Sequence, residues 1–236
     1  LATGEFIAWM DNDDLADPER VRLGMAVMRA RPDVVVVFSD FSAFASPDVE
    51  IERSHIASYY SAIGRLGGMA AILPAHATLP AGTIPGGEAV SYRVGEAYEA
   101  LLEGNFIHPP TALMRRSALE RAGPIDESLR IASEYEQTIR MARLGPVAYI
   151  ERALLRYRRS DSQLSSYTTS AGRVESETVY VLDKVRREDP ALAARRRGLF
   201  RRRLGTACVE AAAGIGASDR GRALRLLVRG IALGPR

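Results

Sequence analysis

Three aspartates lie within four positions near the start of the chain, directly after a short apolar run. The run extends from Phe6 to Met10, and Asp11, Asp13 and Asp14 follow it. Carboxylate oxygens are the ligands that hard divalent cations such as Mg²⁺ and Mn²⁺ prefer. Open α/β sheets bind ligands just beyond the carboxyl ends of their strands. The spacing therefore predicts a divalent-cation site, and the competing interpretation is a solvated acidic loop.

Two other motifs that use such aspartates do not fit this segment. An EF-hand loop starting at Asp11 needs glycine at its sixth position and glutamate at its twelfth. The chain has Ala16 and Arg22 at those positions. A phosphatase of the haloacid-dehalogenase type would use Asp11 as nucleophile and would need a small hydroxyl residue or valine where Leu15 stands.

A second acidic pair, Glu134 and Glu136, opens a predicted helix in the second half of the chain. Arg140 follows Glu136 by four positions, so a structural i,i+4 ion pair is one interpretation. A carboxylate near a helix start also interacts favourably with the helix dipole. Beside a metal–diphosphate site, Glu134 would instead be able to accept a proton from an attacking hydroxyl.

The residues around the three aspartates follow the order strand, helix, strand. After the first apolar run, Asp17 suits the cap of a helix and Pro18 its first position. Apolar residues keep helical spacing to about Arg31, and Pro32 ends the helix. Val34 to Phe38 is apolar and β-branched and predicts a strand. This order is typical of an α/β fold with parallel pairing.

Residues 41–105 are rich in Gly, Pro and Ala and show weak periodicity. We expect a long excursion with helical pieces, the clearest running from Gly95 to Leu102. Long loops inside compact domains are often functional.

Regular patterns return after residue 105. A lone histidine, His108, lies beside two prolines and is expected to be structural. Thr111 to Met114 suits a strand, and Ser117 is expected to cap a short helix that ends at Gly123. A second helix is predicted from about Ser133 to Leu144, and the segments VAYI and ALLRYR after it predict two short strands.

The charges of the chain are unevenly distributed. The 236 residues carry a net charge of +3, but residues 184–236 hold 14 Lys and Arg against 4 Asp and Glu. The tail therefore has a net charge of +10 and the remainder, residues 1–183, a net charge of −7. Two or three helices are predicted from Ser170 onward, the last with an apolar stripe that comprises Ala223, Leu226, Leu227 and Ile231.

The basic tail is interpreted first as a solvated, arginine-rich helical face. Attraction to an anionic membrane surface is the second interpretation. A nucleic-acid partner is disfavoured because the segment RRRGLFRRRLG has Phe200 as its only aromatic residue and offers no stacking platform.

Composition limits the class of protein. Hydrophobic residues make up 47% of the chain, which is ample for a core. A single cysteine, Cys208, excludes an intrachain disulfide framework and favours a cytoplasmic location. No apolar run approaches the roughly 20 residues that span a bilayer. We therefore expect a cytoplasmic protein, with the tail as a means of peripheral contact at the inner face of a membrane.

Together these segments resemble glycosyltransferase family 2, the inverting transferases with the A-type nucleotide-diphospho-sugar fold. The resemblance lies in ATGEFIAWMDNDDLADPERV with its Asp-x-Asp-Asp motif, in VVVVFSD, and in TALMRRSALERAGPIDESLRIASEYEQTIRMARLGPVAYIERALLRYRRSDSQLS. It covers about residues 1–45 and 104–166. It implies a partial, Rossmann-like α/β mixed sheet over residues 1–169, with 41–105 as an acceptor-side insertion, and a basic helical extension over 170–236.

The resemblance also implies a function and roles for residues. The activity would be transfer of a sugar from a nucleotide-diphospho-sugar to a hydroxyl of a glycan or lipid-linked acceptor, with inversion. Asp11, Asp13 and Arg158 would bind the donor, and Asp13 and Asp14 would hold Mg²⁺ or Mn²⁺ at its diphosphate. Glu134 stands where the family usually has an aspartate that acts as general base.

The chain departs from the family pattern in three places. Ser133–Glu134 replaces the usual acidic pair, and Ser160 stands where a histidine is common. The strand–helix–strand half that cradles the nucleotide base has no counterpart before Leu1, so the strand at Phe6 would lack a neighbour. We therefore expect a truncated domain, and the alternative function is a non-catalytic, transferase-like module that serves as a scaffold or as a membrane-surface or partner-binding domain.

Overall fold

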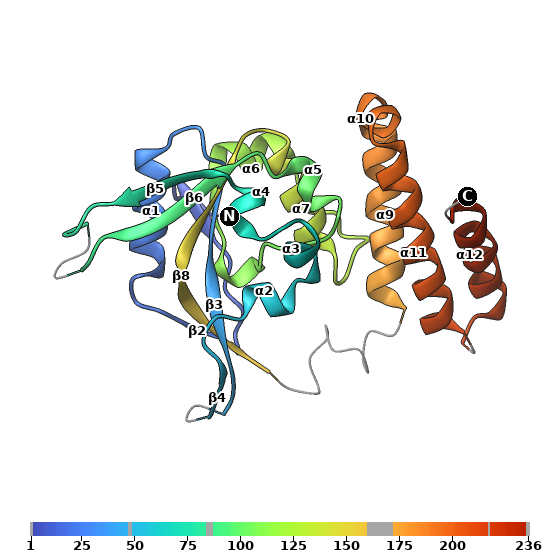
Figure 1. Cartoon of the computed structure of the whole chain (residues 1–236), viewed down its shortest axis with the longest axis horizontal. Helices are drawn as coiled ribbons and strands as arrows, with labels where there is room; N and C mark the ends of the chain where they lie inside the picture. The colour runs from blue at the N-terminus through green and yellow to red at the C-terminus, as the bar shows by residue number, and fades with distance from the viewer. Residues whose placement is uncertain (1, 47–48, 84–86, 160–171, 217, 235–236) are drawn as a thin grey trace. The chain divides into compact units, whose positions relative to one another are not determined.

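The structure is a computed structural model (Figure 1) that describes residues 2–46, 49–83, 87–159, 172–216 and 218–234. Its contacts divide the chain into two compact units. Unit 1 comprises Leu1–Ile125 and Gln137–Arg159, and unit 2 comprises Asp126–Glu136 and Ser160–Arg236. The predicted domain boundary at 169/170 and the departure at Ser160 both lie outside the described residues.

Unit 1 is built on a mixed sheet, which in the described part of the chain has eight strands. The strands are β1 (Phe6–Ala8), β2 (Leu15–Ala16), β3 (Val36–Ser46), β4 (Val49–Glu52), β5 (Ala75–Leu79), β6 (Val90–Gly95), β7 (Leu113–Arg115) and β8 (Val147–Arg158). The order is β1-β7-β3-β8-β6-β5, with β2 added to β8 and β4 to β3. The predicted α/β class with a mixed sheet is confirmed.

Several strands of the sheet run in the same direction. Strand β7 runs antiparallel to both β1 and β3, and β3 runs parallel to β8. Strands β1, β3 and β8 therefore point the same way, although β7 separates the two strands for which parallel pairing was expected. Strand β1 is terminal in the described sheet, which explains why Phe6 and Ile7 are only half-buried.

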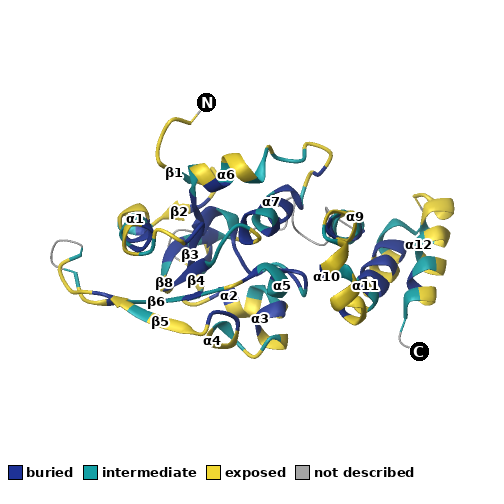
Figure 2. Cartoon of the chain, turned by 90° about the horizontal axis from the view of Figure 1, so that it is seen from above, coloured by how far each residue is buried: buried dark blue, intermediate teal, exposed yellow. Residues whose placement is uncertain are grey.

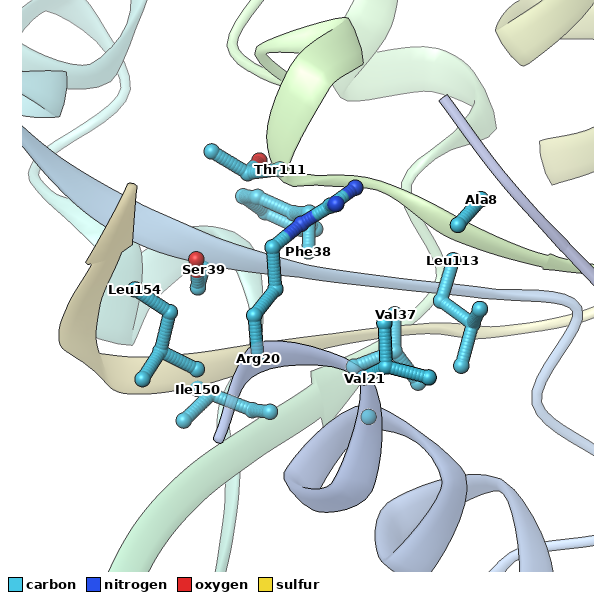
Figure 3. Close-up of a pocket in the computed structure, with 11 residues that line it drawn as sticks. Ala8, Arg20, Val21, Val37, Phe38, Ser39, Thr111, Leu113, Ile150 and Leu154 are labelled. Carbon is cyan, nitrogen blue, oxygen red and sulfur yellow. The ribbon is translucent and has the colours of Figure 1, made fainter. Parts of the chain in front are cut away.

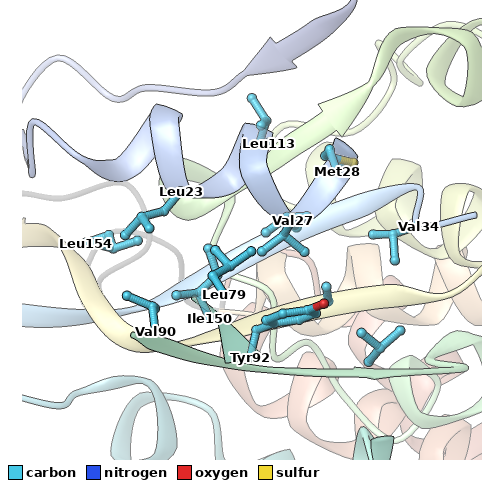
Figure 4. Close-up of a cluster of buried hydrophobic side chains, with 13 residues drawn as sticks. Leu23, Val27, Met28, Val34, Leu79, Val90, Tyr92, Leu113, Ile150 and Leu154 are labelled. Atoms are coloured by element: carbon cyan, nitrogen blue, oxygen red, sulfur yellow. The ribbon is translucent and has the colours of Figure 1, made fainter. Parts of the chain in front are cut away.

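Helix α1 (Arg20–Ala30) covers one face of this sheet and forms a hydrophobic core with it. Leu23 and Val27 are fully buried and pack toward side chains of β3, β6 and β8 (Figure 4). Gly24 allows the close approach of the helix, because a Cβ there would lie 3.0 Å from Leu113 Cδ2. The amphipathic spacing that predicted this helix is what buries its apolar side.

The remaining helices of unit 1 are short. They are α2 (Ile56–Tyr59), α3 (Ser61–Arg65), α4 (Met69–Ile72), α5 (Tyr98–Leu101), the 3₁₀ turn η1 (Pro109–Thr111) and α6 (Arg116–Ala122). Helix α7 (Ser133–Ala142) begins in unit 2 and continues into unit 1.

Several helix and strand boundaries differ from the prediction. Helix α1 begins two residues later than expected, with Glu19 at its N-cap, while Asp17 Oδ1 accepts a hydrogen bond from the Glu19 N–H at 2.8 Å. Helix α6 follows directly on β7, so Arg115 rather than Ser117 takes the N-cap position. Gly123 ends α6 as predicted, with a φ of 88° that favours glycine.

The segment 41–105 is not an excursion from the sheet. Strand β3 continues to Ser46, and the hairpin of β5 and β6 joins the sheet because β6 pairs with β8. In β6 the side chains of Val90, Tyr92 and Val94 are buried in alternation. The two short strands predicted after α7 form one strand, β8, whose register against β3 shifts between Ile150 and Ala153.

Unit 2 is helical. Its helices are α9 (Arg173–Glu188), α10 (Pro190–Arg195), α11 (Arg197–Ile215) and α12 (Arg220–Leu233), so the described residues contain four helices after residue 170 rather than two or three. Helix α11 lies between α9 and α12 and packs against both (Figures 1 and 2). Among the described helices, none has the length and apolar character needed to cross a membrane.

Candidate functional site

The acidic loop, which we define as Trp9–Asp14, leaves the carboxyl end of β1 and leads to the end of β8. Strand β2 follows the loop and pairs antiparallel with β8, with Leu15 opposite Arg156. The N–H of Asp17 then donates to the carbonyl oxygen of Leu154 at 3.0 Å. The predicted carboxylates therefore lie at the edge of the sheet where β3 and β8 end, which is the location expected for a ligand site.

The carboxylate of Asp14 joins this loop to the last residue of β8. Asp14 is 6% exposed, and its Oδ1 accepts a hydrogen bond from the backbone N–H of Arg158 at 2.9 Å. Arg158 Nε donates to the carbonyl oxygen of Asp13 at 2.9 Å, and its guanidinium lies 4.8 Å from the ring centroid of Phe44. The structure thus brings together Asp13, Asp14 and Arg158, three of the residues that the sequence proposed for the site.

The second carboxylate oxygen of Asp14 lies where a negative charge is unfavourable. Oδ2 is buried and has no hydrogen-bond partner in the described part of the chain. Burial together with the charges of Asp13 and Asp11 raises the pKa of Asp14 to about 6, although the hydrogen bond from Arg158 opposes the shift. A buried acceptor without a partner costs about 1–3 kcal/mol, so this oxygen favours either a proton or a cation beside it.

The donor set agrees only in part with the predicted cation site. Asp11 and Asp13 are exposed, and among the described residues no group of three or more His, Cys, Asp or Glu side chains is arranged to hold a metal ion. Mg²⁺ is commonly held by one or two carboxylates together with substrate phosphates and water. Asp14 Oδ2, with Asp13 beside it in sequence, fits that mode of binding, and the cation remains a prediction.

A buried arginine that the sequence analysis missed holds the start of the acidic loop. Arg20 is 6% exposed, and its guanidinium donates to the carbonyl oxygens of Trp9 at 2.6 Å and Ala112 at 3.2 Å. Figure 3 shows Arg20 extending from the start of α1 into a small pocket toward Thr111. The pocket holds only ≈ 10 Å³, about the space of one water molecule. We therefore assign Arg20 to positioning the loop rather than to binding substrate.

Glu134 begins α7 in unit 2, whereas the acidic loop belongs to unit 1. The hydroxyl of Ser133 donates to Glu134 Oε2 at 2.8 Å. The residue that departs from the family pattern therefore orients the carboxylate next to it. The role of general base that the resemblance assigns to Glu134 remains a prediction.

The segment just before Glu134 is fixed by the carboxylate of Glu177 on α9. Glu177 Oε2 accepts hydrogen bonds from three successive backbone N–H groups, those of Arg130 at 3.1 Å, Ile131 at 2.8 Å and Ala132 at 2.9 Å. N–H groups at the start of a helix lack partners within the helix. Glu177 supplies an acceptor and a negative charge at that end, which also suits the helix dipole.

A partly buried ion-pair cluster holds the same segment from both sides. Lys184 Nζ lies 2.8 Å from Asp126 Oδ2 and 2.9 Å from Glu136 Oε1. Hydrogen bonds from Lys184, Ser128 and Tyr180 hold the pKa of Asp126 below its usual range. Glu136 therefore pairs with a lysine of α9.

Arg140, the proposed partner of Glu136 on α7, lies within unit 1. It donates to the carbonyl oxygens of Gly123 at 3.2 Å and Pro124 at 2.8 Å, just beyond the end of α6. These carbonyl groups have no partner within the helix, so Arg140 satisfies them.

The lone histidine expected to be structural lies in an aromatic cluster with Phe41, His55, Tyr59, Tyr60 and Tyr157. The ring of His108 stacks on Phe41 at 4.2 Å, and its Nδ1 lies 3.0 Å from the Tyr60 hydroxyl. Burial lowers the pKa of His108 to about 3. The imidazole is therefore neutral at physiological pH, which fits a packing role.

The chain matches no protein-family model and no curated protein. The resemblance to glycosyltransferase family 2 therefore rests on the motifs, while the α/β class rests on the structure.

We predict that replacing Asp14 with Asn changes how stability depends on pH. The folded protein keeps a proton on Asp14 up to pH about 6, whereas an unperturbed carboxyl loses it near its ordinary pKa of 3.8. Because the folded state binds more protons, ionisation of Asp14 lowers stability as the pH rises between these values. Asp14→Asn keeps an acceptor for Arg158 N–H and cannot ionise, so its Tm relative to the wild type should rise from about pH 4 to about pH 7. A Tm difference that does not vary with pH would contradict this assignment.

We predict that Lys184→Met destabilises the protein by about 3 kcal/mol, because Glu136 is left as a buried carboxylate without its lysine. The matched control on α9 is Arg186→Met, which removes a partly exposed ion pair with Asp183 (Arg186 Nη1 to Asp183 Oδ1, 3.4 Å). Such pairs contribute at most about 1 kcal/mol. Urea unfolding of both variants measures the difference, and equal losses would show that the Lys184 cluster is not stabilising.

Proposed function

We propose that this chain is a glycosyltransferase that moves a sugar from a nucleotide-diphospho-sugar to an acceptor hydroxyl with inversion, and that it depends on Mg²⁺ or Mn²⁺. The observation that carries the proposal is the convergence of Asp13, Asp14 and Arg158 at the edge where strands β3 and β8 end. A positive charge at that edge would stabilise Asp14 Oδ2, which is buried without a hydrogen-bond partner among the described residues.

The charge of the acidic loop determines how a diphosphate would be accommodated. Asp11, Asp13 and Asp14 would repel a donor diphosphate, so the donor needs positive charge between its phosphates and the carboxylates. Bound there by Asp13 and Asp14, Mg²⁺ or Mn²⁺ would supply that charge and stabilise the diphosphate leaving group. Arg158 adds a fixed guanidinium whose orientation is set by its bond to the Asp13 carbonyl and by the ring of Phe44.

The resemblance implies that Asp11 binds the donor, and we assign it to the donor's ribose. It is exposed near the buried Asp14, and its charge acts on that residue. A neutral sugar hydroxyl can donate to such a carboxylate without adding negative charge. The donor's phosphates and ribose would thus be bound by different carboxylates of one loop.

Glu134 is assigned the role of general base. A carboxylate can take the proton of an acceptor hydroxyl as that oxygen attacks the anomeric carbon. The Ser133 hydroxyl holds one of the two carboxylate oxygens, so the side chain is oriented before the acceptor binds. The acceptor class, a glycan or a lipid-linked sugar, follows from the family resemblance.

The first test is donor turnover. The chain should release nucleoside diphosphate from at least one member of a panel of UDP-, GDP- and dTDP-sugars when Mn²⁺ or Mg²⁺ is present, and release should stop with EDTA. Asp13→Asn and Asp14→Asn should each lower the rate about a hundredfold, because both weaken charge stabilisation of the leaving group. The control Asp33→Asn alters an exposed carboxylate that pairs with Arg31, and it should leave the rate unchanged. Full activity in EDTA, or in both loop variants, would reject the proposed site.

The second test separates chemistry from binding. Glu134→Gln should lower the transfer rate about a hundredfold, because the amide cannot accept the proton, while calorimetry shows unchanged binding of the nucleoside diphosphate with Mn²⁺. A large loss of binding with normal chemistry would reassign Glu134 to the donor. Metal-dependent nucleotide binding by the wild type, with no turnover of any donor, would support the non-catalytic module instead.

A further inference from the structure

The outward side of α12 carries a feature that the proposed transferase activity does not use. The inward side of the helix is fixed first. Arg229 makes two hydrogen bonds of 2.7 Å to the carboxylate of Asp183. Gly230 packs against α11 so closely that a Cβ there would lie 2.7 Å from Val209 Cγ2 and 3.0 Å from the Gly205 carbonyl oxygen. The orientation of α12 against α11 is therefore set by packing and by an ion pair.

The opposite side of α12 is apolar and exposed. Leu224 is 62% exposed, Val228 60%, Ile231 69% and Leu227 38%. These four residues, which we call the outer stripe, recur at helical spacing on one face. Figure 2 shows that exposed residues cover the side of α12 away from α11. The predicted stripe of this helix is therefore wrong in part, because Leu227 and Ile231 point outward while Ala223 and Leu226 are half-buried.

Single exposed apolar residues are normal on a protein surface, but a contiguous apolar face on one helix marks an interaction site. Exposed arginines accompany it. Arg220, Arg222 and Arg225 are exposed, and the helix contains no carboxylate between residues 220 and 233. The N-cap residue Asp219 is the nearest acidic residue in the sequence. The partner of this face must therefore offer both apolar area and negative charge.

A second arginine-rich feature lies in the same unit. A pocket of ≈ 290 Å³ is lined by Arg186, Arg197 and Arg201 together with apolar side chains that include Phe200 and Leu233. Its lining combines positive charge and apolar area, as the outer stripe and its neighbouring arginines do. Residues 184–236 as a whole carry a net charge of +10, so the electrostatic field of this part of the chain attracts anionic surfaces.

Two other partners satisfy only one of the two requirements. A nucleic acid offers phosphates but no apolar surface for Leu224, Val228 and Ile231. A second copy of α12 offers apolar area, but pairing two outer stripes would bring arginines against arginines with no carboxylate on either helix. An anionic bilayer offers both, since its surface attracts arginine and its acyl boundary accepts apolar side chains.

We propose that α12 docks on the surface of an anionic phospholipid bilayer. The outer stripe lies at the boundary between headgroups and acyl chains, and Arg220 and Arg225, which lie on or beside the stripe, contact the lipid phosphates. The docking is independent of the proposed transferase activity, and its test uses neither nucleotide sugars nor divalent cations.

The test is flotation of the full chain with vesicles in EDTA. The wild type should float with vesicles of phosphatidylcholine and phosphatidylglycerol, remain unbound with phosphatidylcholine alone, and dissociate as NaCl is raised. The triple variant Leu224→Ser, Val228→Ser, Ile231→Ser should bind at least about tenfold more weakly, because each side chain loses apolar area that the bilayer would bury. Arg220→Gln with Arg225→Gln should weaken binding to the anionic vesicles, because two positive charges beside the outer stripe are removed.

The matched control is Val49→Ser with Ile51→Ser on β4, which removes two apolar residues of comparable exposure, 53% and 47%, from unit 1. It should bind vesicles as the wild type does, and circular dichroism checks that all variants are folded. Unchanged binding by the triple variant, or equal binding to neutral vesicles, would overturn the proposal. A wild-type dimer that the triple variant abolishes would assign the stripe to a second copy, and retention of vesicle-free protein on duplex DNA through the stripe would assign it to nucleic acid.

Discussion

One buried carboxylate ties the exit of β1 to the end of β8. Asp14 Oδ1 accepts the backbone N–H of Arg158, and Arg158 in turn donates to the carbonyl oxygen of Asp13. Because the two segments are 144 positions apart, this reciprocal contact closes the acidic loop over the carboxyl ends of the strands. Arg20 holds the other end of the loop through Trp9 and Ala112, so the loop has a defined path along the sheet edge.

The arrangement is not the one that stability alone would favour. An asparagine at position 14 would make the same bond to Arg158 without placing a buried charge beside Asp11 and Asp13. Asp11 and Asp13 add to the cost, since their charges raise the pKa of Asp14 further. Places where a chain breaks the ordinary rules of burial without local compensation are often functional. A cation shared with a diphosphate would remove the repulsion and supply the missing partner of Oδ2 together, which links the electrostatic cost to the proposed activity.

The local features of this chain could be predicted from the sequence, and the long-range ones could not. The apolar, β-branched composition of Val34 to Phe38 predicts strand β3. The acidic loop could be predicted because its three carboxylates lie close together in the sequence. The strand β6 was missed although Val90, Tyr92 and Val94 alternate with polar residues, because the Gly- and Pro-rich residues around it masked that signal. The role of Arg20 could not be read from the sequence, since its carbonyl partners are set by the fold.

The same distinction changes the interpretation of the basic tail. The resemblance divides the chain into a catalytic part and an appended helical extension, but residues 126–136 belong to the helical unit. Glu177 binds the N–H groups just before Glu134, and Lys184 pairs with Asp126 and Glu136 on either side of it. Residues of α9 thus fix the backbone that carries the proposed general base. If Glu134 is catalytic, α9 is part of the active enzyme, whereas the outer stripe of α12 remains free to bind a surface.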